Sequence, residues 1–288
     1  QQARRRPAGA ASVTFLLRIF LAAAALVAAG AYPAIALEIS GTFIQGGLAT
    51  GKVEPGTKLT LDGQPVAVAP NGSFIIGFGR KAKAKMVLRA EPPEGPLEER
   101  ELAIERRKYK IQRIDGLPQR KVSPTKPEDL ARIKSDQIQI AEVRKRTTLK
   151  TFFDTGFMWP VEGRISGVYG SQRILNGKPR SPHNGVDVAA PRGTPVKTMG
   201  DGVVALVNED MFFTGKTVMI DHGLGLTSVY IHMDKTTVKE GDFVTKGMQI
   251  GTVGATGRAT GPHLHWGVSW FKTALDPALL VGPQKTGK

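Results

Sequence analysis

The sequence predicts an all-β protein with two β-rich regions joined by a basic linker. Between residues 38 and 105, short segments such as Thr57–Leu61 alternate polar and apolar side chains, and that segment ends at Asp62-Gly63, a typical hairpin turn. From residue 153 onward, glycine-rich turns separate short runs of β-branched residues, a spacing typical of a barrel or sandwich. A helical pattern stands out only between these two regions.

The first 36 residues have the composition of an export signal. Three arginines at 4–6 precede an alanine-rich apolar run over residues 19–31, and residues 34–36 (Ala-Ile-Ala) match the small-residue pattern of a cleavage site. We therefore expect residues 1–36 to be a cleaved signal peptide and the protein to be exported, to the periplasm or cell envelope. The alternative is an uncleaved anchor, but a span of about 20 residues would have to include Arg18.

Residues 37–108 are expected to form a small immunoglobulin-like β-sandwich. Asn71-Gly72 marks a second turn, and residues 73–76 and 85–89 have the composition of further strands. The segment contains no histidine and no catalytic constellation. Its expected role is positioning, binding or shielding.

Residues 109–150 are expected to form a basic, partly helical linker. Thr125, with Glu128 three residues later, resembles a capped helix start. Four apolar side chains then fall near one helical face: Leu130, Ile133, Ile140 and Ala141. The pattern favours a helix that packs weakly on a neighbouring domain or acts as a spacer.

The charge of the chain is concentrated in this middle segment. The formal net charge is +15, and residues 106–150 alone hold 14 basic and 5 acidic residues. Nucleic acid is a common partner of such a patch, but export argues against it. We interpret the segment as a solvated, flexible linker, with adhesion to an anionic envelope surface as its functional alternative.

Most of the histidines lie in short motifs with metal-ligand spacing. The His-Leu-His motif at 263–265 places two imidazoles on one face of a strand, because side chains alternate along it. His183 and Asp187 are four residues apart, and Gly185 between them permits a bend that brings both side chains to one ion. Each motif alone is also compatible with an ordinary surface loop or strand.

A third motif ends at His232, directly after an apolar strand. Together the motifs supply three candidate metal ligands and two candidate proton carriers, the inventory of a zinc hydrolase. The chain has no cysteine, so only His, Asp and Glu are available to a metal, which is compatible with zinc. The remaining histidine, His222, sits in a turn and is expected to make structural hydrogen bonds.

The segment from about Trp159 to Asp276 resembles the lysostaphin/LytM-type zinc metallopeptidases, which cleave peptide cross-bridges of peptidoglycan. The resemblance is carried by seven segments, which are residues 181–187 (SPHNGVD), 193–196 (GTPV), 201–204 (DGVV), 221–223 (DHG), 230–233 (YIHM), 238–242 (VKEGD) and 254–266 (GATGRATGPHLHW). It covers somewhat under half of the chain. It implies a peptidase domain over residues 151–282, followed by a tail at 283–288.

The resemblance also implies a fold and a set of roles. The domain is a small antiparallel β-domain with its site in a groove. His183, Asp187 and His265 are the implied zinc ligands, and His232 and His263 the implied catalytic histidines. Three protein ligands would leave zinc an open position for water and substrate. Which histidine acts as general base is not readable from the sequence.

The expected function is therefore a secreted zinc endopeptidase acting on peptidoglycan peptides, with D-alanyl-diaminopimelate cross-links of a Gram-negative periplasm as the favoured substrate. The alternatives are a catalytically silent LytM-type domain that binds and activates a cell-wall amidase, a non-haem iron oxygenase with the same facial ligand set, and a lipoyl-type carrier barrel. The full ligand set disfavours the first, and the missing Met-Lys turn the last. The sequence leaves open whether a regulator acts on the protein.

Overall fold

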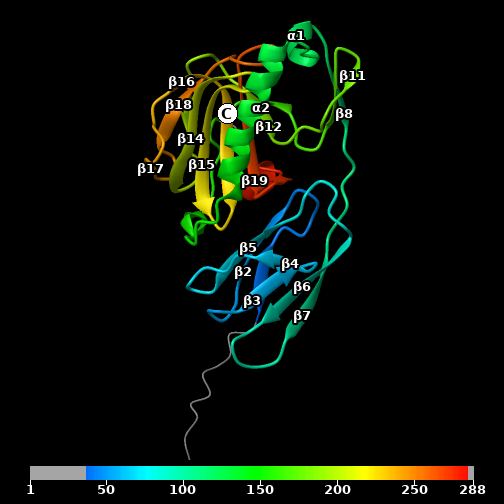
Figure 1. Ribbon diagram of the computed structural model, residues 1–288, viewed down its shortest axis with the longest axis vertical. Coiled ribbons are helices and arrows are strands. Elements are labelled where there is room, and N and C mark those ends of the chain that lie inside the picture. The colour runs from blue at the N-terminus through cyan, green and yellow to red at the C-terminus, as the bar shows by residue number, and fades with distance from the viewer. Residues whose placement is uncertain (1–36, 285–288) are drawn as a thin grey trace, which may run out of the picture. The chain divides into compact units, whose positions relative to one another are not determined.

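The computed structural model describes residues 37–284 and shows a mostly β protein with few helices (Figure 1). The expected signal peptide at 1–36 lies outside the described residues, as does the end of the tail, 285–288. Within the described part, no helix has the length and apolar character needed to cross a membrane. The all-β fold class expected from the sequence is confirmed.

Residues 38–103 form two antiparallel sheets with strand orders β1-β2-β5 and β4-β3-β6-β7. The strands are β1 (Glu38–Gly41), β2 (Leu48–Lys52), β3 (Lys58–Leu61), β4 (Gln64–Val66), β5 (Ser73–Gly77), β6 (Lys85–Glu91) and β7 (Glu98–Ala103). Buried side chains such as Leu59, Phe74 and Leu88 form one core in this region. In a constant-type immunoglobulin domain the fourth strand joins the sheet of strands one, two and five, whereas here it pairs with the third.

The hairpin between β3 and β4 has the turn that the sequence predicts at Asp62-Gly63. Asp62 and Gly63 both have positive φ, 49° and 77°, as a two-residue type I′ turn requires. The Asp62 carboxylate accepts a hydrogen bond from the backbone N–H of Val87 at 2.8 Å. The turn is thereby tied to the neighbouring strand β6.

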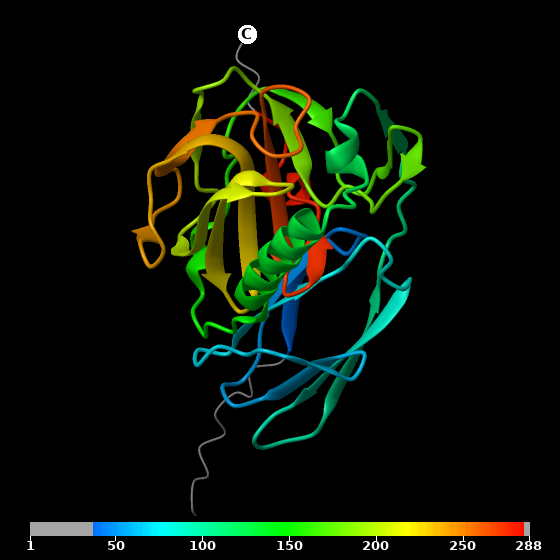
Figure 2. The ribbon, with the colours of Figure 1, turned by 45° about the horizontal axis from the view of Figure 1, so that its top comes forward.

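The segment between the two β-regions is packed, which corrects the expectation of a solvated, flexible linker. It contains β8 (Ile111–Ile114), α1 (Gln119–Val122), α2 (Pro127–Lys145) and the short 3-10 helix at Phe152–Thr155. Strand β8 pairs in parallel with β10 (Gln172–Leu175). Helix α2 lies against β14 (Gly202–Met211), and Figure 2 shows it crossing the sheet. Backbone pairing and packing, rather than charge repulsion, decide the conformation of this segment.

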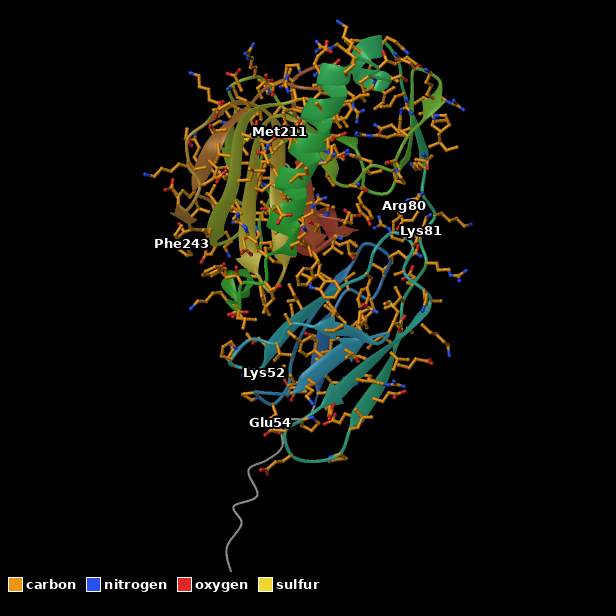
Figure 3. The ribbon with its side chains drawn as sticks, viewed as in Figure 1. Lys52, Glu54, Arg80, Lys81, Met211 and Phe243 are labelled. Atoms are coloured by element: carbon orange, nitrogen blue, oxygen red, sulfur yellow. The ribbon has the colours of Figure 1, made fainter. Side chains whose placement is uncertain are left out.

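Helix α2 packs on the sheet with only part of the predicted face, because Ile133, Ile140 and Ala141 are half-buried but Leu130 is exposed. Val143 is buried and Ile140 half-buried against a small cluster that includes Met211, whereas Leu130 is 49% exposed. The position of Met211 beside the helix is seen in Figure 3. The buried Asp129 carboxylate, which pairs with Arg120, takes the inward position next to Leu130. At this end of the helix a buried carboxylate, paired with an exposed arginine, takes the inward place that Leu130 was expected to hold.

The start of α2 also differs from the capped start expected at Thr125. Lys126 is the N-cap residue and makes no side-chain cap, while Pro127 occupies the first helical turn. Proline suits this place because its φ is already helical and its missing N–H would have no partner there. Glu128 lies in the first turn, where a carboxylate is favourable to the helix dipole.

Residues 164–275 form a large, mainly antiparallel sheet with the path β17-β14-β15-β16-β19-β12-β9. Its strands are β9 (Arg164–Gly167), β12 (Val186–Ala189), β13 (Pro195–Lys197), β14, β15 (Gly215–Gly223), β16 (Leu226–Thr236), β17 (Phe243–Val244), β18 (Gln249–Val253), β19 (His263–Trp270) and β20 (Thr273–Leu275), and the helix α3 (Ala278–Val281) follows. Strand β18 pairs with both β13 and β16, so the sheet curls. Its core includes Tyr230, Leu264 and Trp266.

Candidate active site

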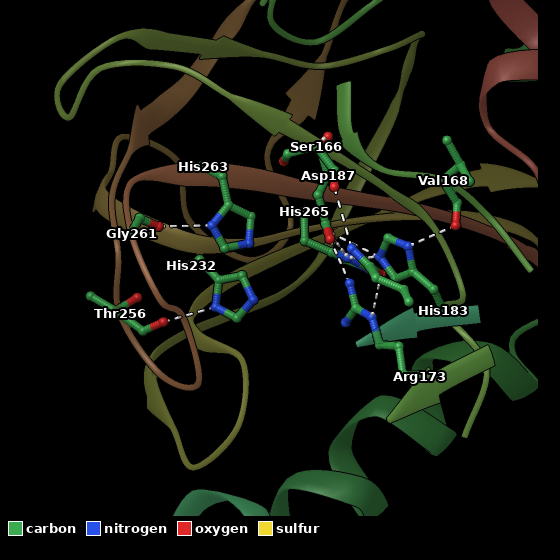
Figure 4. A network of polar contacts seen from close by, with 11 residues as sticks. Ser166, Val168, Arg173, His183, Asp187, His232, Thr256, Gly261, His263 and His265 are labelled. Atoms are coloured by element: carbon green, nitrogen blue, oxygen red, sulfur yellow. Dashed lines mark hydrogen bonds and ion pairs between the residues drawn. The ribbon is translucent and has the colours of Figure 1, made fainter. Parts of the chain in front are cut away.

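Three side chains from two distant parts of the chain, near residues 183–187 and at 265, converge on one point in the large sheet. His183 Nε2 lies 2.9 Å from Asp187 Oδ1, and His265 Nδ1 lies 2.7 Å from the same oxygen (Figure 4). The two imidazole nitrogens are 2.9 Å apart. The structure thus brings together the three residues expected to bind metal.

The strand register explains this convergence. Asp187 on β12 and His265 on β19 are direct cross-strand partners, so their side chains emerge side by side. His183 joins them from the turn before β12. The backbone bends at Gly185, as inferred, without a left-handed φ. A Cβ there would lie 2.3 Å from the Trp266 carbonyl oxygen and 2.9 Å from His265 Nε2. Its role is to let two segments approach closely.

Contacts behind the ligands hold them in place. His183 Nδ1–H donates to the Val168 carbonyl at 3.0 Å, which leaves the Nε2 lone pair for a metal. Asp187 uses Oδ1 toward the histidines and accepts a bond from Arg173 on Oδ2 at 2.5 Å. Burial raises the pKa of Asp187, but its interactions with His183 and His265 outweigh burial and hold that pKa well below its usual range. The carboxylate is therefore ionised.

The donor set fits a zinc ion. Two imidazole nitrogens and one carboxylate oxygen all lie within 4.8 Å of one another, and none of the three residues is more than slightly exposed. Donor atoms on a tetrahedral zinc, bound at about 2.0–2.1 Å, are about 3.3 Å apart. The spacings of 2.7–2.9 Å need only a small outward shift to reach that geometry.

A second histidine pair lies beside this group. The rings of His232 and His263 are 4.8 Å apart between centroids, and His232 is 6.4 Å from His265. His232 Nδ1–H donates to the Thr256 carbonyl, and His263 Nδ1–H to that of Gly261, both at 2.8 Å. The second nitrogen of each ring points toward the ligand group (Figure 4).

His232 is held in an unusual backbone conformation that the sequence did not signal. Its φ is +64°, in the left-handed region that L-residues other than glycine seldom adopt. Because this conformation breaks the alternation of the strand, two successive side chains, Ile231 and His232, line the same hollow of the surface. Burial, with repulsion from His263 and His265, lowers the pKa of His232 to about 3, so the ring is neutral.

His222 lies apart from these residues and makes structural contacts. Its ring bonds to the Asp201 carbonyl at 2.6 Å and to Ser228 Oγ at 2.7 Å. Complete burial lowers its pKa to about 4. The hydroxyl of Tyr230 extends this buried network through Ser228.

The candidate metal ligands and the pair of His232 and His263 line a groove that consists of two adjoining hollows. A hollow of about 720 Å³ contains His183, His232 and His265, and an adjoining one of about 280 Å³ contains Asp187 and His263. Both hollows share four lining residues: Arg173, Leu175, His232 and Arg258. The larger hollow is also lined by the linker, through Val122–Pro124, Ile140 and Arg144. Sequence reasoning did not predict this wall.

The comparisons with known proteins agree with this geometry. The family model "Peptidase family M23" matches residues 181–277, which include all five predicted site residues. A crystal structure described as a putative peptidase M23 from Pseudomonas aeruginosa is 32% identical, with a TM-score of 0.64, and the match covers 84% of this chain and 96% of that one. The chain belongs to peptidase family M23.

Two curated M23 relatives match a shorter part of the chain. Peptidoglycan DD-endopeptidase ShyA of Vibrio cholerae is 44% identical over 111 residues, 38% of this chain and 26% of ShyA. Peptidoglycan DD-endopeptidase ShyB of the same organism is 46% identical over 87 residues, 30% of this chain and 20% of ShyB. The matches thus span about a fifth to a quarter of these relatives.

Proposed function

We propose that this M23 protein is a zinc-dependent endopeptidase that hydrolyses peptide cross-links of bacterial peptidoglycan after export to the cell envelope. The observation that carries the proposal is the convergence of His183, Asp187 and His265, with the second nitrogens of His232 and His263 pointing toward them. The names of ShyA and ShyB as peptidoglycan DD-endopeptidases support the substrate. The signal-like composition of residues 1–36 supports the location.

His183, Asp187 and His265 would hold the zinc ion. Bound there, zinc supplies a Lewis acid that polarises a carbonyl and makes water acidic near neutral pH. The protein's own contribution begins with orientation: the Val168 carbonyl and Arg173 hold the outer atoms of His183 and Asp187. Nε2 of His183 and Oδ1 of Asp187 therefore both face the point where the metal would bind.

The histidine pair would handle the proton. Each ring carries its hydrogen on Nδ1, because that atom faces a carbonyl, and so offers the lone pair of Nε2 to water in the groove. His232 would accept a proton from water at this nitrogen and pass it to the leaving amine. Its neighbour His263 would stabilise charge that develops on the carbonyl oxygen.

We further propose that residues 151–282 carry the activity and that residues 37–108 and 109–150 are accessory. The linker is nevertheless part of the active-site wall, since Arg144 of α2 lines the groove. The complete ligand set disfavours a silent domain that only binds an amidase. A metal-free protein that stimulated an amidase would restore that alternative.

The test is digestion of purified sacculi by the zinc-loaded mature protein, with released muropeptides identified by mass spectrometry. The proposal predicts about one zinc per chain and new peptide ends at cross-links, with none released by the His232→Ala variant. Intact cross-links in the presence of the zinc-loaded protein would contradict the proposed activity. Cleavage at a glycan bond or at the amide to muramic acid would contradict the proposed bond class.

A further inference from the structure

Four arginine side chains line the larger hollow beside the candidate metal site: Arg144, Arg173, Arg180 and Arg258. They come from separate elements, namely helix α2, strand β10, the segment after β11 (Lys178–Pro179) and the loop before β19. Among the described residues that line this hollow there is no Asp or Glu. We call these four side chains the arginine cluster.

Two members of the arginine cluster hold helix α1 in place through neutral acceptors. Arg180 Nη2 donates to the Val122 carbonyl and to Ser123 Oγ, both at 2.8 Å. Arg258 Nη1 donates to the Lys121 carbonyl at 3.3 Å. These bonds fix the direction of both guanidinium groups but leave their positive charge uncompensated.

The positive charge of the cluster lacks nearby carboxylates. Arg173 pairs with Asp187, but within residues 37–284 no carboxylate lies within ion-pair distance of the other three guanidinium groups. The Nε atoms of Arg144 and Arg180 are buried and have no hydrogen-bond acceptor among the described protein atoms. Burial lowers the pKa of Arg144, and burial with repulsion from Arg173 and Arg180 lowers that of Arg258 to about 10.

Uncompensated, half-buried cations are costly unless a ligand neutralises them. A metal ion bound at the neighbouring site would add further positive charge. We propose that the arginine cluster is a binding site for a carboxylate of the peptide substrate, next to the bond that is cleaved. The proposal rests on the proposed peptidase function, and it names a chemical feature that the substrate must carry.

A carboxylate suits this site because a guanidinium group offers a planar fork of N–H donors that matches its two oxygens. Peptidoglycan stem peptides carry such groups on D-glutamate and on diaminopimelate, and either can be masked as an amide. An amide has the same size but no charge. The site is therefore expected to separate free from amidated stem peptides, and Arg258, which lines both hollows, is the first residue to test.

The experiment compares synthetic D-alanyl-diaminopimelate cross-linked peptides in which each carboxylate is either free or amidated. Dissociation constants are measured by calorimetry on the zinc-loaded His232→Ala protein, and cleavage is measured on the wild type. Amidation at the recognised position should weaken binding about tenfold or more. Adding Arg258→Gln or Arg144→Gln should weaken binding of the free carboxylate by a similar factor and leave the amidated peptide within about twofold.

Arg146→Gln is the matched control, because Arg146 follows the same helix, is exposed and lines neither hollow. It should leave binding of both peptides unchanged. A purely structural role of the cluster would weaken both peptides alike and lower the melting temperature. Equal binding and cleavage of the free and amidated peptides would overturn the carboxylate site while the peptidase stands. Carboxylate-dependent binding without cleavage would keep the site and overturn the peptidase, and neither binding nor cleavage would overturn both.

Discussion

Two parts of the groove differ in how their charges are balanced. The floor is formed by the three candidate metal ligands and the histidine pair beside them, and the wall by the linker and the arginine cluster. On the floor, the Asp187 carboxylate is shared by His183, His265 and Arg173, so its charge is compensated within the protein. On the wall, Arg144 and Arg258 have no carboxylate partner among the described residues. A compensated site is ready for chemistry that is the same for every substrate, whereas an uncompensated one distinguishes substrates by their charge.

The two parts also differ in how they are built. The floor comes from adjacent strands, with Asp187 and His265 in direct register. The wall comes from the linker, the hairpin of β10 and β11, and the loop before β19 that carries Arg258. The linker and the hairpin are joined through the parallel pair of β8 and β10. Changes to the floor should therefore abolish activity, while changes to the wall should alter substrate preference or stability.

Removing the shared carboxylate should have the largest effect. Asp187→Asn takes a charged ligand from the metal site and unpairs the partly buried Arg173, so metal affinity should fall by more than about 100-fold. Hydrolysis of sacculi should fall to background. Metal analysis and muropeptide release measure both. The control Asp234→Asn removes a surface ion pair with Arg192 and should change the unfolding free energy little. Retained metal in the Asp187→Asn protein would contradict the ligand assignment.

Acidification should destabilise the protein through its buried neutral histidines. The pKa of His222 is about 4 in the folded protein, below its ordinary value of 6.5, so the unfolded chain binds the proton more tightly. The stabilisation is present above pH 6.5 and is lost as the pH falls through 4, by about 3 kcal/mol in total. Thermal unfolding of the wild type and of His222→Gln between pH 7 and 4 measures this. The variant should lose less stability over that range, and equal pH dependence would contradict the assignment.

Removing the side chain that holds Asp187 in place should have a moderate effect on zinc affinity. Arg173→Gln leaves all three ligands in place but removes the charge that fixes Asp187 Oδ2, so zinc affinity should fall about 10- to 100-fold. At saturating zinc, much of the hydrolysis should return. Zinc titration of both proteins measures the difference. Unchanged zinc affinity would show that Arg173 belongs to the wall alone.

The smallest expected effects concern how the wall is attached. Val143→Ala opens space between α2 and the sheet and should lower the unfolding free energy by about 1–3 kcal/mol. Leu130→Ala, at an exposed position of the same helix, should change it by less than about 0.5 kcal/mol. Chemical denaturation compares the two. A larger loss for Leu130→Ala would restore the helical face predicted from sequence.

The motifs of the floor could be recognised in the sequence because the residues of each motif lie within a few positions of one another. Strand alternation puts His263 and His265 on one face, and the four-residue spacing of His183 and Asp187 joins a turn to a strand. The left-handed conformation of His232 was not readable, since nothing in an apolar strand announces a positive φ. The wall was not readable either, because its residues meet only through long-range pairing.

The net charge of the linker did not predict its conformation. Its many basic residues indicated a solvated segment, but several of them make specific contacts. Arg120 pairs with the buried Asp129, Lys121 lies over the Phe212 ring at 4.0 Å, and Arg144 lines the groove. Composition counts charges without placing them, so a packed basic segment and a solvated one look alike.

The most direct test of the division of labour on the floor is to measure zinc content and sacculus hydrolysis on the same preparations of His183→Ala and His232→Ala. We predict that His183→Ala loses both zinc and hydrolysis, because it removes a ligand. His232→Ala should keep about one zinc per chain and lose hydrolysis, because it removes only a proton carrier. Hydrolysis at the wild-type rate by His232→Ala, or a full zinc complement in His183→Ala, would contradict the account.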